Sequence, residues 1–383
     1  MKSVEILFSE NLKKRRRHLK ITQRSLADKL GYSEKAISKW ESGKCMPPAS
    51  ILPKLANILA TDIDSLLYEE SELLYYLGID GGGTKTECVL FKSSGEVVLR
   101  ALSGGSNPNV KGMSNACEAL REVLDKCMER GVPVRHIYAG IAGSSSGNNR
   151  RELIDFLKKQ YPVSRITVES DIMNVIGLAE DNSRCVAGII GTGFASFGWD
   201  GKELCRKGGL GYMFDGAGSG YDMGREVITR TLAYEEGFLP FSELVRLTHI
   251  KLGGRAMDAL AKIYAGGVDY VASFASVTFE AQALGDLDAE RIINKSARRV
   301  ADCVNALRSE RELGDTVVIS GGIARGVPLM QKKLREYIGD GACVEFPELP
   351  PIFGAMRRAL DLSGAEYDFD SLKEKFKLSV RGE

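Results

Sequence analysis

The stretch Asp80-Gly81-Gly82-Gly83-Thr84-Lys85-Thr86 carries residue types that can bind a phosphate group. Three consecutive glycines lack Cβ atoms, so successive backbone N–H groups can approach an anion closely. The hydroxyls of Thr84 and Thr86 add donors, and Lys85 adds positive charge. Asp80 can hold Mg2+ through water, because magnesium keeps most of its hydration shell in proteins. The stretch therefore predicts a phosphate-binding turn with a metal-binding carboxylate beside it.

The residues around this turn predict two strands. Apolar residues alternate over 77–79 and return over 89–91, and the glycines lie between them. The spacing fits neither a Walker loop, GxxxxGK[ST] before a helix, nor a dinucleotide-binding GxGxxG loop. An ordinary hairpin, in which the glycines only supply positive φ, is the alternative that turn chemistry leaves open.

Two further glycine turns follow in the chain. An apolar segment from Cys185 runs into Gly191-Thr192-Gly193, and Phe194 to Trp199 reads as the returning strand. Residues 315–320 predict another strand, which ends at Gly321-Gly322. Two strand-turn-strand units of this kind arise by accident far less often than one, which favours phosphate binding over an ordinary hairpin.

The sequence of Asp80 to Thr86 resembles the first phosphate motif of the actin/hexokinase/Hsp70 ATPase fold. It is most similar to the branch of N-acetylglucosamine kinases and BadF/BadG-type ATPases. Gly191–Gly193 resembles the second phosphate motif, and Gly321-Gly322 resembles the adenosine motif. The resemblance implies ATP and Mg2+ as cofactors. It also implies an α/β, two-lobed, actin-like (ribonuclease H-like) body over 76–383, with lobes at roughly 76–185 and 186–350 and a last helix returning to the first lobe.

Asp171 is the candidate catalytic residue. It ends a strand predicted over 166–171, and α/β folds place ligand groups at such strand ends. By order and context it matches the catalytic aspartate of the kinases. This resemblance implies that Asp171 is the base that accepts the proton of the sugar hydroxyl. A plain helix cap for the segment that starts at Ile172 is the alternative.

Three other residues are candidates for substrate binding. Asn107 lies in a loop similar to the one that touches the sugar in the kinases, and Ser144 lies in a loop of small residues. The segment 208–224 resembles the kinase pattern GGWGxxxGDEGSxYxxG, but Leu210 stands where the kinases have tryptophan. The Asp-Glu pair is also missing, and the nearest acid, Asp215, lies one place early. Ordinary turn chemistry remains the alternative for Asn107 and Ser144.

The first 70 residues predict an all-α domain. Residues 22–31 and 33–43 each begin at a capping residue and end at a glycine, so they predict two short helices joined by a three-residue turn. A helix over 7–19 precedes them. Further helical segments at 51–59 and 62–67 complete a five-helix unit, and residues 68–73 form a short connection to the body.

This head resembles the lambda-repressor-like (XRE) helix-turn-helix family, whose pattern TQxxLAxxLGxSxxxISxWExG it follows closely. The resemblance implies binding of a double-stranded DNA operator, with Gln23 on phosphate and the second motif helix in the major groove. Arg15, Arg16 and Arg17 would add phosphate contacts. The DNA-binding candidates are Gln23, Glu34, Lys35, Ser38, Lys39 and Lys44. A helical protein-interaction module with a basic face is the alternative.

Charge and composition agree with this division. Residues 1–44 hold twelve Lys and Arg against five Asp and Glu, whereas the remaining chain carries a net charge of −6. A basic head on an acidic body suggests a nucleic-acid partner for the head alone. The eight cysteines show no CxxC spacing, no apolar run is long enough to span a membrane, and no signal peptide is visible. We therefore expect reduced thiols and a cytoplasmic protein.

Together these features predict a DNA-binding regulator, acting as a homodimer, whose body binds Mg-ATP and phosphorylates or senses an amino sugar such as N-acetylglucosamine. Two alternatives stay open. One is a sensor that binds its ligand without turnover. The other is an ATPase that activates a partner enzyme, as BadF-type relatives do; it is disfavoured because only Cys88, Cys185 and Cys205 are candidates for ligands of a bridging cluster.

Overall fold

The computed structural model describes residues 3–59, 61, 63–67, 74–215, 217–310 and 313–381. It divides into two compact units, Met1–Leu74 and Tyr75–Glu383. The connection expected at 68–73 lies outside the described residues. No helix of the described chain is long and apolar enough to cross a membrane.

The first unit is helical, as the sequence predicts. Its elements are α1 (Val4–His18), α2 (Gln23–Leu30), α3 (Glu34–Glu41), the short 3-10 turn η1 (Ala49–Ile51), α4 (Leu52–Ile58) and α5 (Asp64–Leu67). The hydroxyl oxygens of Thr22 and Ser33 accept from the backbone N–H groups of Ser25 and Ala36, which caps α2 and α3. Gly31 ends α2 in the left-handed region at φ 77°. The capping residues thus set the helix-turn-helix.

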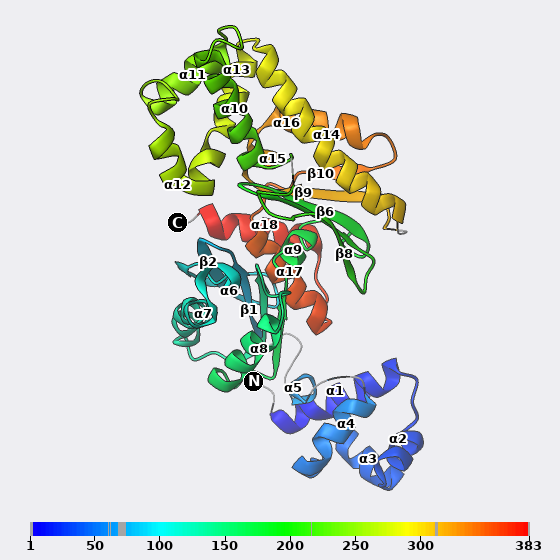
Figure 1. Ribbon diagram of the computed structural model, residues 1–383. Coiled ribbons are helices and arrows are strands. Elements are labelled where there is room, and N and C mark those ends of the chain that lie inside the picture. The colour runs from blue at the N-terminus through cyan, green and yellow to red at the C-terminus, as the bar shows by residue number, and fades with distance from the viewer. Residues whose placement is uncertain are drawn as a thin grey trace. The chain divides into compact units, whose positions relative to one another are not determined.

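The body contains two five-stranded sheets of the same topology (Figure 1). The first sheet has the order β3-β2-β1-β4-β5 and the second has the order β10-β9-β6-β7-β8. In each, the first strand in the chain is central, with an antiparallel hairpin on one side and parallel strands on the other. The first sheet comprises β1 (Tyr75–Gly81), β2 (Lys85–Lys92), β3 (Val97–Gly104), β4 (Val134–Ile141) and β5 (Arg165–Glu169). The second comprises β6 (Cys185–Ile190), β7 (Phe194–Trp199), β8 (Leu204–Gly208), β9 (Thr316–Ser320) and β10 (Cys343–Glu345).

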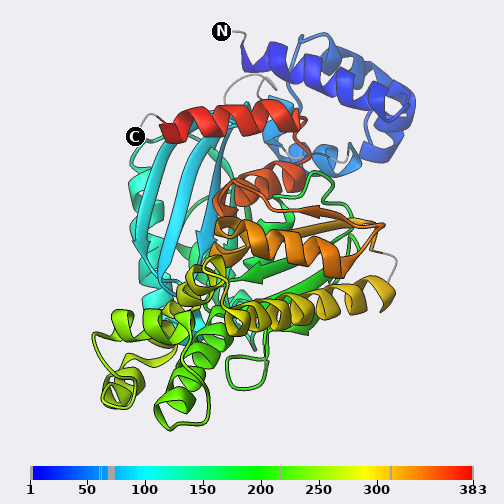
Figure 2. The same ribbon diagram turned by 90° about the horizontal axis from the view of Figure 1, so that it is seen from above.

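Helices cover both faces of the sheets. In the first lobe, α6 (Pro108–Lys111) packs on α7 (Met113–Met128), α7 covers β2 and β3, and α8 (Asn149–Gln160) packs against β5. In the second lobe, α14 (Leu287–Glu310) and α16 (Pro328–Ile338) lie side by side, and α14 lies against β6 to β8 (Figure 2). The apolar residues of α14 that recur every three or four positions are buried there, so they belong to the core. They are Ile293, Ala297, Val300, Val304 and Leu307. The remaining helices are α10 (Gly220–Glu235), α11 (Glu243–Leu252), α12 (Leu260–Ser273), α13 (Ala275–Ala283), α15 (Gly322–Gly326) and α18 (Phe369–Arg381).

Two helices lie between the sheets, α9 (Ile172–Ile176) and α17 (Pro351–Ser363) (Figure 1). The helix α17 packs on β1, β4 and α9, while α9 also contacts β6 and β9 of the second lobe. Their crossing has no room for side chains. A Cβ atom on Gly354 would overlap the carbonyl oxygen of Asn174, and one on Gly177 would lie 2.6 Å from the carbonyl oxygen of Gly354.

This crossing generates a stability prediction. We expect Gly354→Ala to lower the free energy of unfolding of the body by about 2–3 kcal/mol, because the added methyl group must push two backbone segments apart. Urea denaturation of the full chain measures the difference. Gly326→Ala is the matched control, since a Cβ atom there meets nothing within 4 Å. Equal stability of the two variants would contradict a close crossing.

Candidate functional site

The first glycine turn is fixed by the loop that follows β3. Gly82 donates its N–H to the carbonyl of Lys85 at 2.9 Å and accepts from the backbone N–H groups of Ser106 and Asn107 at 3.0 and 3.1 Å. A Cβ atom on Gly81 would overlap the hydroxyl of Ser106, whereas one on Gly83 would meet nothing within 4 Å. Gly81 is thus a packing glycine, and the open space lies at Gly83.

The side chains of this turn divide into exposed and buried groups. Thr84 is exposed, and Lys85 is 64% exposed with its ammonium 3.4 Å from the carboxylate of Glu87. Glu87 is buried and also pairs with Arg100 at 2.7 Å. Thr86 departs from expectation, because its buried hydroxyl donates to the carbonyl of Gly104 at 2.7 Å. The Thr86 hydroxyl thus joins β2 to the end of β3, and the donors that remain for an anion are the backbone, Thr84 and Lys85.

The second glycine turn, between β6 and β7, occupies the equivalent place in the second sheet. The carbonyls of Gly191 and Thr192 accept from the backbone N–H groups of Gly220 and Tyr221, at 2.8 and 3.0 Å, which ties the turn to the start of α10. Thr192 and Gly193 are exposed, and Cβ atoms on Gly191 and Gly193 would meet nothing within 4 Å.

A cavity of about 390 Å³ opens beside the second turn. It is lined by Gly191 and Thr192 of the turn, by Gly322, Ile323 and Val327 after β9, and by residues of α12 and α13. Gly321 does not line it; its φ of 106° lets the turn after β9 lie against the backbone of Ile190, where a Cβ atom would overlap the carbonyl. The structure therefore brings the expected second phosphate motif and the Gly322 end of the adenosine motif to one cavity.

Asp80, near the end of β1, lies close to Asp171. Asp171 does not end a strand as the sequence predicts, because β5 stops at Glu169 and the Asp171 side chain caps α9 by accepting from the N–H of Ile172. The pKa of Asp80 is raised to about 6, mainly by burial and also by the nearby negative charge of Asp171, against the lowering effect of a hydrogen bond from Asn174. Burial also raises the pKa of Asp171, and hydrogen bonds from the hydroxyl of Ser170 and the N–H of Ile172 lower it. Two neighbouring carboxylates that are short of water favour a shared proton or a bound cation.

The donor set at Asp80 fits magnesium. Among the described residues, no group of three or more His, Cys, Asp or Glu side chains is arranged as a metal cluster. Magnesium does not need one, because it is commonly held by one or two carboxylates together with water and substrate phosphates. Asp80, beside an open glycine turn, supplies such a carboxylate.

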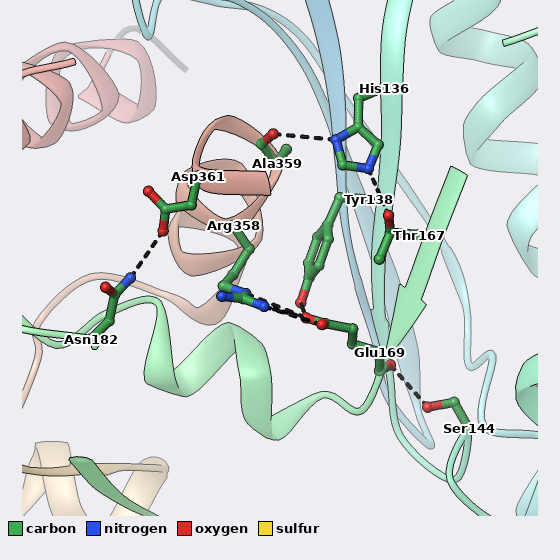
Figure 3. Close-up of polar contacts among 9 residues, drawn as sticks. All are labelled: His136, Tyr138, Ser144, Thr167, Glu169, Asn182, Arg358, Ala359 and Asp361. Carbon is green, nitrogen blue, oxygen red and sulfur yellow. Dashed lines mark hydrogen bonds and ion pairs between the residues drawn. The ribbon is translucent and has the colours of Figure 1, made fainter. Parts of the chain in front are cut away.

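The three candidate substrate residues have different surroundings. The oxygen of the Asn107 side chain caps α6 by accepting from the N–H of Asn109 at 2.9 Å, and the side chain lies against Gly143. Ser144 departs from expectation: it is buried, and its hydroxyl donates to the carbonyl of Glu169 at 2.9 Å (Figure 3). Asp215 is buried, and its two oxygens accept from the N–H groups of Leu210 and Gly211 at 3.0 and 3.1 Å. Asp215 thus shapes its own loop, and Asn107 is the candidate nearest to solvent.

The head presents a polar surface on α3. Glu34, Lys35, Ser38 and Lys39 are exposed on this helix, while Ile37 and Trp40 are buried, and Lys44 is exposed just after it. Gln23 donates from its side-chain amide to Glu41 at 2.7 Å. Arg16 is also engaged, because its guanidinium forms a two-pronged ion pair with the buried Glu41, including an Nη2 to Oε2 bond of 2.9 Å. Arg16 therefore stabilises the head, and phosphate contacts are left to its neighbours.

Comparison with known proteins identifies both parts. A model of the BadF/BadG/BcrA/BcrD ATPase family matches residues 77–356. The chain belongs to this family. A helix-turn-helix family model matches residues 12–66, so the protein is a helix-turn-helix DNA-binding domain fused to a sugar-kinase-like ATPase domain.

Relatives of each part agree with this assignment. An N-acetylmuramic acid/N-acetylglucosamine kinase of Clostridium acetobutylicum is 26% identical over 281 residues, covering 69% of this chain and 90% of that protein. The uncharacterized HTH-type transcriptional regulator YqaE of Bacillus subtilis is 45% identical over 65 residues, 17% of this chain and 56% of that protein. A crystal structure of a putative N-acetylglucosamine kinase of Porphyromonas gingivalis has the fold of the body, with a TM-score of 0.60 at 22% identity over 76% of this chain and 99% of that one. The two-lobed actin-like fold is thereby confirmed.

The cysteines of this ATPase domain are not arranged to bridge a cluster. Cys88 is fully buried, with its sulfur 3.8 Å from that of Cys127. Cys185 is also buried, which raises its pKa to about 12, and Cys205 lies near the carbonyl of Gly198. None of them lines the cavity beside the second turn. The geometry therefore gives no support to an activator that carries a cluster.

Sequence analysis missed the polar network under α17. Arg358 forms a buried ion pair with Glu169, which also accepts from the hydroxyl of Tyr138 at 3.0 Å (Figure 3). His136 lies nearby and bonds to Thr167 and to the carbonyl of Ala359; burial lowers its pKa to about 4. Two adjacent arginines after the apolar first half of α17 were the sequence signal for this network. The network fixes Glu169 two residues before Asp171.

The pKa of Asp80 generates a second prediction. Between pH 3.8 and about 6 the Asp80 carboxyl loses its proton in the unfolded chain before it does so in the folded chain. The ionised carboxylate therefore lowers the free energy of unfolding as the pH rises through this range. We expect Asp80→Asn to raise the free energy of unfolding by about 1–3 kcal/mol at neutral pH and to change it little below the unfolded pKa. Urea denaturation at the two pH values measures this. A variant that is less stable at neutral pH would contradict the assignment.

The exposed face of α3 generates a third prediction. We expect Lys39→Ala to weaken binding to a selected operator by about 1–3 kcal/mol, and less on unrelated DNA, if Lys39 reads a base edge. Lys44→Ala is the matched variant, expected to weaken binding equally on every sequence and to reduce the salt dependence, as a phosphate contact does. Fluorescence anisotropy on an operator selected from random duplexes measures both. A uniform loss for Lys39→Ala would make it a phosphate contact.

Proposed function

We propose that the body transfers the γ-phosphoryl group of ATP to an amino sugar and that its ligands change how the head binds its operator. One observation carries the catalytic part: Asp80 and Asp171 lie together, both with raised pKa, beside a glycine turn. Burying carboxylates away from water destabilises a fold. Groups whose pKa is shifted in this way are common at active sites. The cavity beside the second turn supports a nucleotide partner.

In this proposal Asp171 is the general base. A sugar hydroxyl is a poor nucleophile near neutral pH, so a carboxylate that orients it and accepts its proton assists in-line transfer. A raised pKa suits this task, because an efficient base titrates near the working pH. The glycine turns would hold the phosphates with backbone N–H groups, and Lys85 would add charge. Asp80 would hold Mg2+, which neutralises phosphate charge when bound.

The amino-sugar assignment rests on relatives. The Clostridium acetobutylicum kinase is named for N-acetylmuramic acid and N-acetylglucosamine, and its alignment spans most of this body. Asn107 is the proposed sugar contact, and Asp215 is a weaker one because both of its oxygens already accept backbone N–H groups.

Coupling to DNA is the regulatory part of the proposal. A single helix-turn-helix module rarely buries enough surface for tight specific binding, so we propose a homodimer on a two-fold operator. Sugar and Mg-ATP would act on the body of each protomer. A melting-temperature screen of amino sugars with and without Mg-ATP identifies the ligand, because binding to the native state raises the melting temperature by mass action.

A sensor without turnover is the second candidate, and the loop at Asp215 favours it. Leu210 is 55% exposed at the place where the kinases have tryptophan, and the nearest acid is turned onto its own backbone. Such a loop offers a sugar fewer contacts than the kinase loop does. A protein of this second kind would bind its sugar without phosphorylating it.

The decisive variant is Asp171→Asn, which keeps an oxygen to cap α9 while it removes the base. We expect the melting temperature to stay the same or rise, because the cap is kept and a carboxylate with a raised pKa is removed, and turnover of the identified sugar to fall about a hundredfold or more. Asp155→Asn, which changes an exposed carboxylate on α8, is the matched control and should keep the wild-type rate. A coupled ADP-release assay, with the phosphosugar confirmed by mass spectrometry, gives the rates.

Two other outcomes are informative. An undiminished rate for Asp171→Asn would refute the base assignment. A wild-type protein that binds sugar and ATP yet makes no phosphosugar would replace the kinase by the sensor.

A further inference from the structure

We propose that Asn174 is a positioning residue of the nucleotide site, which fixes the carboxylate of Asp80 in the orientation that serves a magnesium-bound nucleotide. The inference rests on the proposed function, in which Asp80 holds the metal. Asn174 itself would touch neither ATP nor the sugar. It would act through Asp80.

The contacts of Asn174 are specific. The side chain is fully buried, and its amide nitrogen donates to Oδ1 of Asp80 at 2.7 Å. The carbonyls of Gly140 and Ile79 lie 3.3 and 3.5 Å from the same nitrogen. Three oxygen acceptors surround this end of the amide, so the nitrogen must point toward them. An amide turned the other way would set oxygen against oxygen.

The other end of the amide shows what this contact costs. Its oxygen has no hydrogen-bond partner among the described residues, although it is buried. An unpaired buried acceptor destabilises a fold, and an apolar side chain of similar size would avoid the loss. The rest of α9 is apolar, with Ile172, Met173, Val175 and Ile176 all buried. A polar residue at this one place is explained by Asp80.

The neighbouring strand makes room for the amide. Gly140 of β4 is the register partner of Asp80, and a Cβ atom there would overlap the Asn174 side chain. Asp171 precedes Asn174 by three residues and caps α9, so one short helix contacts both carboxylates. Asp171 caps the N-terminus of α9, and Asp80 is hydrogen-bonded to α9 through Asn174. The distance between the two carboxylates is thereby set by helical geometry.

A positioning role predicts a selective loss. Backbone N–H groups of the glycine turns do not depend on Asn174, so ATP affinity without metal should stay the same. The gain in ATP affinity on adding Mg2+ should fall, because residues that orient a metal-binding group typically change metal affinity about 10–100-fold when they are lost. A merely structural role would weaken both affinities together.

The test is calorimetric titration of the full chain with ATP, in EDTA and in excess Mg2+, for three variants. Asn174→Leu keeps the volume and removes the donor. Gly140→Ala keeps the residue Asn174, but the added Cβ atom on β4 pushes the Asn174 amide out of its position. Thr248→Val is the control, because it removes a buried hydroxyl whose hydrogen bond, to the carbonyl of Leu244, lies within α11.

We expect Asn174→Leu and Gly140→Ala each to reduce the magnesium-dependent gain about tenfold or more, with metal-free affinity within about twofold of wild type. Thr248→Val should keep the whole gain. A full gain in Asn174→Leu, or an equal loss with and without metal, overturns the proposal. A wild-type protein without any gain overturns the metal role of Asp80, and the proposed function with it. Should Asn174→Leu fail to fold, Gly140→Ala decides alone.

Discussion

The candidate site of the body is built around two carboxylates that the fold holds partly out of water, at a cost to its stability. Asp80 lies in β1 and Asp171 follows β5 as the cap of α9; burial raises the pKa of both, and the charge of Asp171 contributes to the raised pKa of Asp80. The fold meets that cost with directed donors, namely Asn174, Ser170 and the N–H of Ile172. The buried helix α9 supplies two of these three groups, and α17 packs against α9. The interior of the body is therefore arranged for an electrostatic purpose as much as for packing.

The two lobes share a topology but not a chemistry. Each central strand runs into a glycine turn, at Gly81 in the first sheet and at Gly191 in the second. The residue before the turn is Asp80 in the first lobe and Ile190 in the second. The ionisable group is thus confined to the first lobe, while the second supplies an open turn and a cavity. The same strand order thus carries different side chains at the same turn in the two lobes.

Sequence patterns predicted the parts whose local chemistry is strong. The caps at Thr22 and Ser33, the glycine turns and the strand Phe194–Trp199 were all predicted, because turn residues and alternation are local. The strands β8 and β10 were not predicted, since Leu204–Gly208 is poor in β-branched residues and Cys343–Glu345 is too short for a pattern. Thr86 and Ser144 looked like donors to a ligand because a sequence does not show which carbonyl a hydroxyl will meet. Asn174 escaped notice for the same reason.

The return of α17 to the first sheet also sets an order of events on the ribosome. The strands of the first sheet are complete at Glu169, but α17, which packs on β1 and β4 of that sheet, begins at Pro351. At roughly 5–20 residues per second, about 10–40 s of synthesis separate the two. The head has a core of its own and needs neither. A nascent chain can therefore carry a finished DNA-binding domain well before the ATPase domain is closed, and a truncation near residue 350 would leave the head attached to an incomplete first lobe.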